Sequence, residues 1–364
     1  MTDPDLLCRR LHNQRLSRVQ FERAEEAVDW LGAVQAQDYG GAKWALAQRT
    51  GGATDVQLDR LCAEGVILRT HVMRPTWHFV LPHDIRWLLQ LTAPRVNAAS
   101  AYYYRKLGLD EAVFRHSNHA LARALEGGQQ LTRTELASVL ERAGIPASGL
   151  RLAYLMMRAE LDAVVCSGAR RGKQFTYALL EERAPAAAVL DRDEALAELA
   201  RRYFTSHGPA LVQDYVWWSG LTVADARAGI EMAAPHLADE AIDGRRYWSA
   251  RFDSVAEDRS PIVHLLPNYD EYLVAYKDHS PAFDPSLFTD ASTADRVLAG
   301  HILVVEGRVM GGWRRLIDKG LVTVEVEPLA PLGAAQEEAL QAEVERYAGF
   351  IGMPASLAFR QPSA

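Results

Sequence analysis

Apolar residues recur at helical spacing in the first part of the chain, and β-rich runs typical of strands follow. The pattern predicts a helix over residues 5–16 and a second, amphipathic helix that follows a Ser17 cap and reaches Leu31. Thr54 begins a third helix, and residues 66–71 and 76–80 form two strands of a hairpin. Helices followed by a hairpin predict a winged helix over residues 1–82.

The same order of elements occurs twice more. Thr132 and Glu135 form a capping box at the start of a helix, a second helix spans residues 150–161, and a hairpin follows with its tip at residues 167–173. Later helical stretches precede a strand pair around residues 244–248. This repetition predicts two further winged helices, over residues 83–190 and 191–260.

From residue 261 the pattern changes to that of a sheet. Strands are expected around residues 301–305 and 321–326, and a helix over residues 335–347. We therefore predict a C-terminal β-rich unit with a terminal helix over residues 261–364. The predicted fold class is α+β, mainly helical, with three tandem winged-helix units followed by this C-terminal unit.

Composition and the N-terminus narrow the class of protein. Hydrophobic residues make up 49% of the 364-residue chain and charged residues 24%, as in a folded globular protein. The three cysteines, Cys8, Cys62 and Cys166, match neither a disulfide framework nor a metal site, which favours a reducing cytoplasm. The acidic N-terminus differs from a signal peptide, and no apolar run reaches the roughly 20 residues that span a membrane.

Charge is divided unevenly along the chain. Residues 1–190 hold 24 Lys+Arg and 20 Asp+Glu, a net charge of +4, whereas residues 191–364 hold 16 and 27, a net charge of −11. Most of the basic residues in the first half are arginines, which bind phosphate in a forked geometry. This imbalance favours a nucleic-acid-binding face built from the first half.

The stretch Gln35-Ala36-Gln37-Asp38 carries the strongest candidate chemistry. Residues two apart lie on different faces of a helix, so a helix must end or distort for Gln35 and Gln37 to serve one site. Gly40 and Gly41 favour such an ending, because glycine adopts the left-handed conformation that closes helices.

Three stretches in the same order carry a family resemblance: VQAQDYGG, LRTHVMRPTWHFV and LPNYDEYLVAYKDHS. Together they resemble the winged-helix DNA glycosylases typified by AlkZ and YcaQ, over nearly the whole chain. The resemblance implies tandem winged helices around a DNA channel and excision of alkylated purines, including N7-alkylguanine and crosslinked bases. It also implies that Gln35 and Gln37 are catalytic, in the Gln-x-Gln form that is similar to the branch for self-resistance to DNA-alkylating natural products.

Glutamines suit this chemistry because an N7-alkylated guanine is cationic and leaves without a general acid. The enzyme then has only to hold a water against the sugar C1′ and stabilise the developing positive charge. Asp38 is a candidate base, although an aspartate at this position more often caps a helix. His78 alternates with Trp77 along its strand, so one of the two faces the channel.

Other candidate residues are expected to contact DNA. Arg74 and Thr76 lie on the first hairpin, and the tip of the second carries three basic residues, Arg170, Arg171 and Lys173, which form either a solvated turn or a phosphate-binding wing. Trp217 and Trp218 are expected in the core.

Two functions from different classes remain open: a monofunctional DNA glycosylase and a non-catalytic winged-helix regulator. The regulator fits the sequence less well. A DNA-recognition helix is expected to be basic, but the predicted helix over residues 150–161 holds only two arginines, and no ligand domain is evident. We expect double-stranded DNA carrying alkylated purines as the partner of a cytoplasmic monomer. We expect no metal, no other cofactor and no membrane association.

Overall fold

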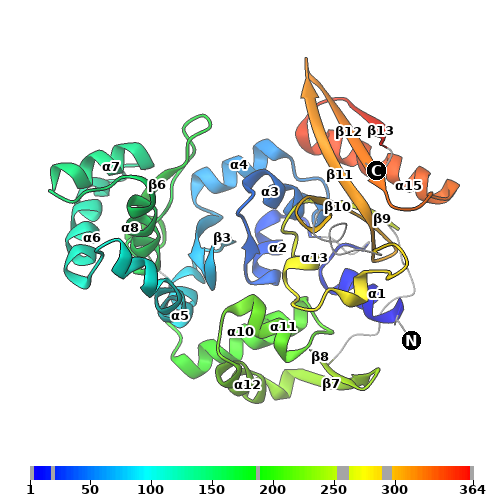
Figure 1. Cartoon of the computed structure of the whole chain (residues 1–364), viewed down its shortest axis with the longest axis horizontal. Helices are drawn as coiled ribbons and strands as arrows, with labels where there is room; N and C mark the ends of the chain where they lie inside the picture. Colours follow the sequence, from blue (N-terminus) through cyan, green and yellow to red (C-terminus); the bar gives the residue numbers. More distant parts are fainter. Residues whose placement is uncertain (1–3, 18–20, 186–188, 252–261, 289–296, 361–364) are drawn as a thin grey trace.

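The computed structural model describes residues 4–17, 21–185, 189–251, 262–288 and 297–360. Within these ranges the chain forms four sheets of three, five, three and two strands, set among helices (Figure 1). The predicted α+β class and C-terminal sheet are confirmed. The number of winged-helix units and their boundaries stay predictions, and the boundary at residues 260 and 261 lies outside the described residues. No described helix has the length and apolar character that crossing a bilayer requires.

The first part of the chain folds around a three-stranded sheet in the order β1-β3-β2. Its elements are α1 (Pro4–Asn13), α2 (Ala24–Leu31), β1 (Val34–Gln35), α3 (Tyr39–Gln48), α4 (Asp55–Glu64), β2 (Leu68–Val72) and β3 (Arg74–Val80). Thr54 caps α4, as predicted, by accepting a hydrogen bond from the Gln57 N–H. The prediction of a helix beginning at Ser17 is wrong: α2 begins at Ala24, because the Phe21 N–H bonds the Arg49 carbonyl instead.

The second part forms a lobe around the sheet β4-β6-β5 (Figure 1). Its elements are α5 (Ile85–Lys106), α6 (Glu111–Leu125), β4 (Leu131–Thr132), α7 (Arg133–Arg142), α8 (Gly149–Leu161), β5 (Val165–Ser167), β6 (Thr176–Leu179) and α9 (Leu180–Arg183). The Thr132–Glu135 capping box at α7 is confirmed.

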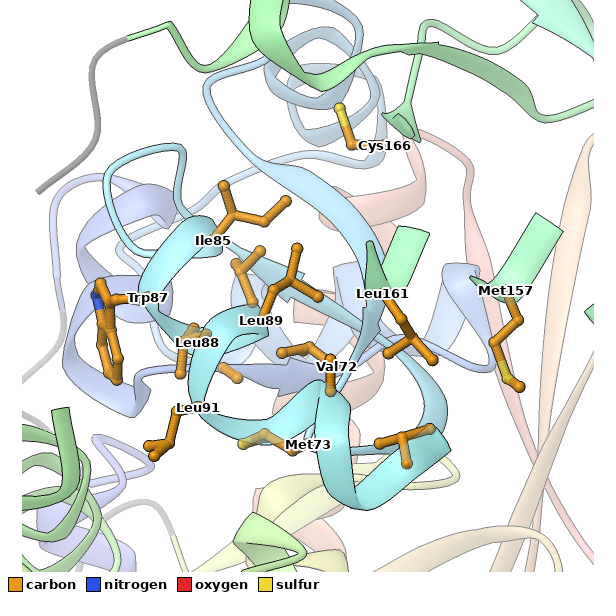
Figure 2. Close-up of a cluster of buried hydrophobic side chains, with 14 of the residues drawn as sticks. Val72, Met73, Ile85, Trp87, Leu88, Leu89, Leu91, Met157, Leu161 and Cys166 are labelled. Carbon is orange, nitrogen blue, oxygen red and sulfur yellow. The ribbon is translucent and has the colours of Figure 1, made fainter. Parts of the chain in front are cut away.

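The long helix α5 connects this lobe to the first sheet. Its first half is buried on several sides, so it lacks the one-sided apolar stripe by which surface helices are recognised. Figure 2 shows Leu89 of this helix near Val72, and both belong to the same buried cluster as Leu161. One continuous core therefore runs from the first hairpin into the lobe.

The third part consists of helices and a two-stranded sheet. Its elements are α10 (Arg192–Ser206), α11 (Val212–Ser219), α12 (Val223–Met232), η1 (Ala234–His236), β7 (Leu237–Ile242) and β8 (Arg245–Ala250). The strand pair confirms the prediction around residues 244–248. α10 packs against α12 and also contacts α2 and α5.

The C-terminal part is a five-stranded sheet in the order β13-β12-β11-β10-β9 with one long helix. Its elements are β9 (Val263–Leu266), α13 (Glu271–Val274), η2 (Ser280–Ala282), β10 (His301–Val305), β11 (Arg308–Asp318), β12 (Leu321–Pro328), α15 (Ala334–Ile351) and β13 (Ala355–Phe359). β11 and β12 form a long hairpin that projects from the body (Figure 1).

Buried polar contacts join the C-terminal part directly to the first part. The Trp44 indole N–H donates to the Leu265 carbonyl at 2.7 Å. Arg49 donates two hydrogen bonds of 2.9 Å to the carboxylate of Asp270, and both side chains are fully buried. Because Asp270 immediately precedes α13, this ion pair places α13 beside β1.

Candidate active site

The glutamine motif lies on a strand and a bend between two helices. Gly32 closes α2 with a φ of 78°, and β1 follows. Asp38 then caps α3 by accepting a hydrogen bond from the Gly41 N–H. The expectation that Gly40 and Gly41 end a helix is wrong, because they begin one. A Cβ at position 41 would come within 2.7 Å of Asp38 Oδ2 and 3.1 Å of Pro267 Cβ, so a larger residue there would displace the capping side chain.

Gln35 is held by its backbone and by its side chain. It lies opposite His78 in the β1–β3 ladder, and its N–H donates to Glu271 Oε1 at 2.8 Å. Its side-chain Oε1 accepts a hydrogen bond from Arg74 Nη2 at 2.7 Å, and only 6% of the residue is exposed. A guanidinium can only donate, so Arg74 fixes which way the amide of Gln35 points.

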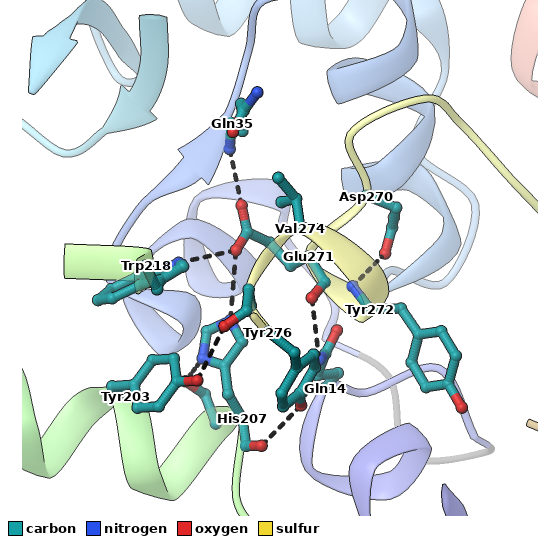
Figure 3. Close-up of polar contacts among 12 residues, drawn as sticks. Gln14, Gln35, Tyr203, His207, Trp218, Asp270, Glu271, Tyr272, Val274 and Tyr276 are labelled. Atoms are coloured by element: carbon teal, nitrogen blue, oxygen red, sulfur yellow. Dashed lines mark hydrogen bonds and ion pairs between the residues drawn. The ribbon is translucent and has the colours of Figure 1, made fainter. Parts of the chain in front are cut away.

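Glu271 lies fully buried behind Gln35 (Figure 3). Its Oε2 accepts a hydrogen bond from Trp218 Nε1 at 2.9 Å, and His207 Nε2 lies 3.5 Å away without hydrogen-bond alignment. Burial acts to raise the pKa of Glu271, but His207, the Gln35 N–H and the Arg74 charge together lower it below its ordinary value. The carboxylate is therefore ionised at neutral pH and stabilises the strand that carries Gln35.

Arg74 connects Gln35 to α11. Its Nη1 donates to the Trp217 carbonyl at 3.4 Å, and its guanidinium carbon lies 6.0 Å from the centre of the Trp217 ring. Burial lowers the pKa of Arg74, and the charge of Glu271 opposes that effect. The prediction that both tryptophans are core residues is wrong for Trp217, which is 49% exposed, and correct for Trp218.

His78 and Thr76 lie two residues apart on β3, so their side chains share the face that carries Gln35. His78 is fully buried, and burial lowers its pKa well below the ordinary value. Its Nδ1 lies 3.0 Å from the Thr76 carbonyl, which can only accept, so Nδ1 carries the proton and Nε2 is an acceptor. Among the described residues, His78 Nε2 and Thr76 Oγ1 have no hydrogen-bond partner.

Gln37 differs from Gln35 in its surroundings. Its side chain is exposed and makes no hydrogen bond with any described residue. It follows the end of β1, where the chain bends towards α3. The structure thus brings Gln35, Arg74 and His78 together and leaves the Gln37 amide open to solvent. Asp38 is half-buried and serves as the cap of α3.

The basic residues at the tip of the second hairpin have separate environments. Arg170 lies against both Tyr39 and Phe175, with its guanidinium carbon 5.0 and 5.2 Å from the ring centres. Arg171 is exposed and forms an ion pair of 2.8 Å with Glu135. Lys173 is exposed and has no ion pair with the described residues. Arg170 therefore joins this hairpin to α3, and Lys173 has the most accessible charge.

One group of acidic and histidine side chains in the described ranges has metal-like spacing: Asp29, His83 and Asp84. The carboxylate of Asp84 already accepts hydrogen bonds from Trp87 Nε1 at 2.8 Å and Arg202 Nη1 at 2.5 Å. Arg202 Nη1 also lies 3.7 Å from Asp29, so its positive charge already interacts with both carboxylates of the group.

Sequence reasoning assigned no role to Glu271 or to an exposed Trp217. Glu271 belongs to one of the stretches that carried the resemblance, but its partner Gln35 lies 236 residues earlier in the chain. No spacing rule connects residues so far apart. The adjacent Trp-Trp pair is also uninformative locally, because burial of each ring depends on how α11 packs.

Comparisons with known proteins agree with this architecture. The family model described as "DNA glycosylase AlkZ-like" matches residues 28–350. A protein of Streptomyces sahachiroi, described as an interstrand DNA cross-link repair glycosylase, is 24% identical over 363 residues, which are 95% of this chain and 96% of that protein. The solved structure of the Streptomyces sahachiroi DNA glycosylase AlkZ superposes with a TM-score of 0.79 at 22% identity, covering 98% of this chain and 99% of that one. The chain belongs to the AlkZ-like DNA glycosylase family.

Proposed function

We propose that this protein is a monofunctional DNA glycosylase that hydrolyses the N-glycosidic bond of alkylated purines, either N7-alkylguanine adducts or interstrand crosslinks. The activity serves DNA repair or self-resistance to a DNA-alkylating natural product. The observation that carries the proposal is a Gln-x-Gln motif in a member of this family whose first amide is oriented by Arg74 and backed by buried Glu271. The similarity to a Streptomyces sahachiroi protein described as an interstrand DNA cross-link repair glycosylase supports a crosslink as one substrate of this enzyme.

In the proposed reaction a water oxygen forms a bond to C1′ while the C1′–N9 bond breaks. The bonding electrons move to the base and cancel the positive charge of the N7-alkylated ring, and the attacking water releases one proton to bulk solvent. Gln37, with its exposed amide, orients the water. Gln35 uses the second lone pair of its Oε1, because Arg74 occupies only one. Both amide oxygens place partial negative charge near the developing sugar cation.

A glutamine cannot take up a full proton, so this site acts only on bases that leave readily. Unmodified guanine is neutral and is a far poorer leaving group. Restriction to cationic purines is thus a consequence of the catalytic residue types.

We propose that three winged helices, over residues 1–82, 83–190 and 191–260, and the C-terminal unit over residues 261–364 enclose a concave channel for duplex DNA. Arg74 and Thr76 are proposed to contact DNA beside the site, and Arg170, Arg171 and Lys173 to bind phosphates as a wing. Lys173 is the most accessible of these. Asp38 and His78 are proposed as support for catalysis, Asp38 by capping the helix that follows Gln37. The enzyme is proposed to act as a monomer in the cytoplasm, without a metal or other cofactor.

Base release from defined duplexes tests this function. One duplex carries a single N7-methylguanine and another an N7-guanine interstrand crosslink, and wild type is compared with Gln35→Ala and Gln37→Ala. Loss of an electrostatic contact at the reacting centre is expected to slow release about a hundredfold in each variant at unchanged DNA affinity.

The other outcomes are equally decisive. Binding by wild type without base release from either duplex would favour the non-catalytic regulator. Release that survives both substitutions would show that other residues carry the reaction. Affinities are compared at one stated salt concentration, because phosphate binding depends steeply on salt.

A further inference from the structure

Trp217 is an exposed aromatic residue at the edge of the candidate active site. Of its surface 49% is exposed, whereas the next residue, Trp218, is fully buried. The guanidinium of Arg74 contacts the Trp217 carbonyl with one nitrogen and the side chain of Gln35 with another. A single side chain therefore separates Trp217 from the first glutamine of the motif.

The ring of Trp217 is fixed in place with much of its aromatic surface open. Its only polar atom, Nε1, donates to the Val274 carbonyl at 3.2 Å. Indole has no other donor, so the ring contacts a ligand through its π surface. The Arg74 guanidinium carbon lies 6.0 Å from the ring centre, at the outer limit of a cation–π contact. The ring thus already lies beside one cation that it binds only weakly.

A buried carboxylate opposes the positive charge of Arg74 beside Trp217. The buried carboxylate of Glu271 hydrogen-bonds both Gln35 and Trp218, which are the spatial and sequence neighbours of the exposed ring. The negative charge of Glu271 attracts the positive charge of Arg74, and each favours the charged form of the other. The exposed Trp217 ring therefore lies beside an arginine whose charge interacts favourably with a buried carboxylate.

We propose that the ring of Trp217 binds the positively charged nucleobase of an N7-alkylated purine by a cation–π contact. This inference rests on the proposed function and extends it, because it assigns a residue to the base while Gln35 and Gln37 face the sugar. Alkylation at N7 places a positive charge on the imidazole ring of guanine that the unmodified base lacks. A π surface attracts the charged ring more strongly, so Trp217 selects alkylated bases. Bond cleavage removes the charge and weakens the contact.

Equilibrium binding to two duplexes of equal shape separates this contact from other effects. One carries N7-methylguanine on a 2′-fluoro sugar, which slows base release, and the other carries neutral 7-methyl-7-deazaguanine on the same sugar. Wild type is compared with Trp217→Phe, which keeps a smaller π surface, and Trp217→Leu, which keeps only apolar volume. Phe359→Leu is the matched control, because Phe359 is a similarly exposed aromatic residue on β13.

Wild type is expected to bind the duplex with the cationic base about three- to tenfold more tightly than the duplex with the neutral base. Trp217→Phe should retain part of that preference, Trp217→Leu should lose it, and Phe359→Leu should keep it in full. A wild-type preference that survives Trp217→Leu, or no preference in wild type, overturns the proposal. The proposed function is judged separately, by base release from N7-methylguanine on an ordinary deoxyribose, so failure of one inference is distinguishable from failure of the other.

Discussion

Replacing Glu271 by glutamine tests whether the buried carboxylate positions Gln35. The substitution keeps the size and one oxygen of the side chain, but it removes the charge and replaces the other oxygen with an NH2 group. Two donors face this carboxylate, the Gln35 N–H at 2.8 Å and Trp218 Nε1 at 2.9 Å. In the variant one of them must face another donor.

The size of the effect follows from these two contacts. A hydrogen bond to a charged group contributes about 1.5–3 kcal/mol, roughly twice as much as a neutral one. If the lost bond is the one to the Gln35 N–H, about 1.5–3 kcal/mol of positioning energy is removed. If the transition state loses this stabilisation in full, base release slows about ten- to a hundredfold.

The assay is single-turnover base release from a duplex carrying one N7-methylguanine, with enzyme in excess, alongside urea unfolding. Glu343→Gln is the matched control, because Glu343 is also a buried glutamate and accepts a hydrogen bond of 2.6 Å from Gln48. It lies on α15, and burial raises its pKa. Its substitution is expected to leave the rate of base release unchanged.

Two results would refute this reasoning. A folded Glu271→Gln protein that releases base at the wild-type rate would show that β1 holds Gln35 without the carboxylate. Equal rate losses in Glu271→Gln and Glu343→Gln would show that the effect comes from general loosening of the core.

Two further predictions concern pH and a close contact at the motif. His78 has a lowered pKa in the folded protein, so the unfolded chain binds more protons below about pH 6.5, and wild type should lose stability relative to His78→Phe by up to about 1.4 kcal/mol for each pH unit below that point. Urea unfolding at pH 7.5 and pH 5.5 measures this, and equal losses in both proteins would contradict it. Gly41→Ala should lower both stability and base release, because the new Cβ would meet Asp38 Oδ2 at 2.7 Å, whereas Gly349→Ala, with no atom within 4 Å, should stabilise α15 by about 0.5–1 kcal/mol. Thermal unfolding and base release of the two variants decide this, and similar behaviour would argue against the clash.

The sequence by itself determined the elements whose signals are local. Thr54 and Thr132 begin helices because their hydroxyls accept hydrogen bonds from backbone N–H groups three residues later, within one turn of chain. The hairpin of β2 and β3 follows from two runs rich in β-branched and aromatic residues, separated by a short turn. The Gln-x-Gln motif and the two other stretches that resemble the family likewise indicated the family without any knowledge of distant contacts.

Tertiary structure decided what surrounds those residues. Local sequence could not tell that Gly40 and Gly41 begin a helix, because glycine fits either end and the choice depends on Asp38 and on the pairing of β1 with β3. It could not separate buried Trp218 from exposed Trp217 either. The contact between Gln35 and Glu271 forms because buried contacts, among them the Arg49–Asp270 ion pair, hold the C-terminal part against the first part. Burial and hydrogen-bond partners depend on the packing of distant segments, whereas helix caps and the composition of strand-forming runs depend on neighbours along the chain.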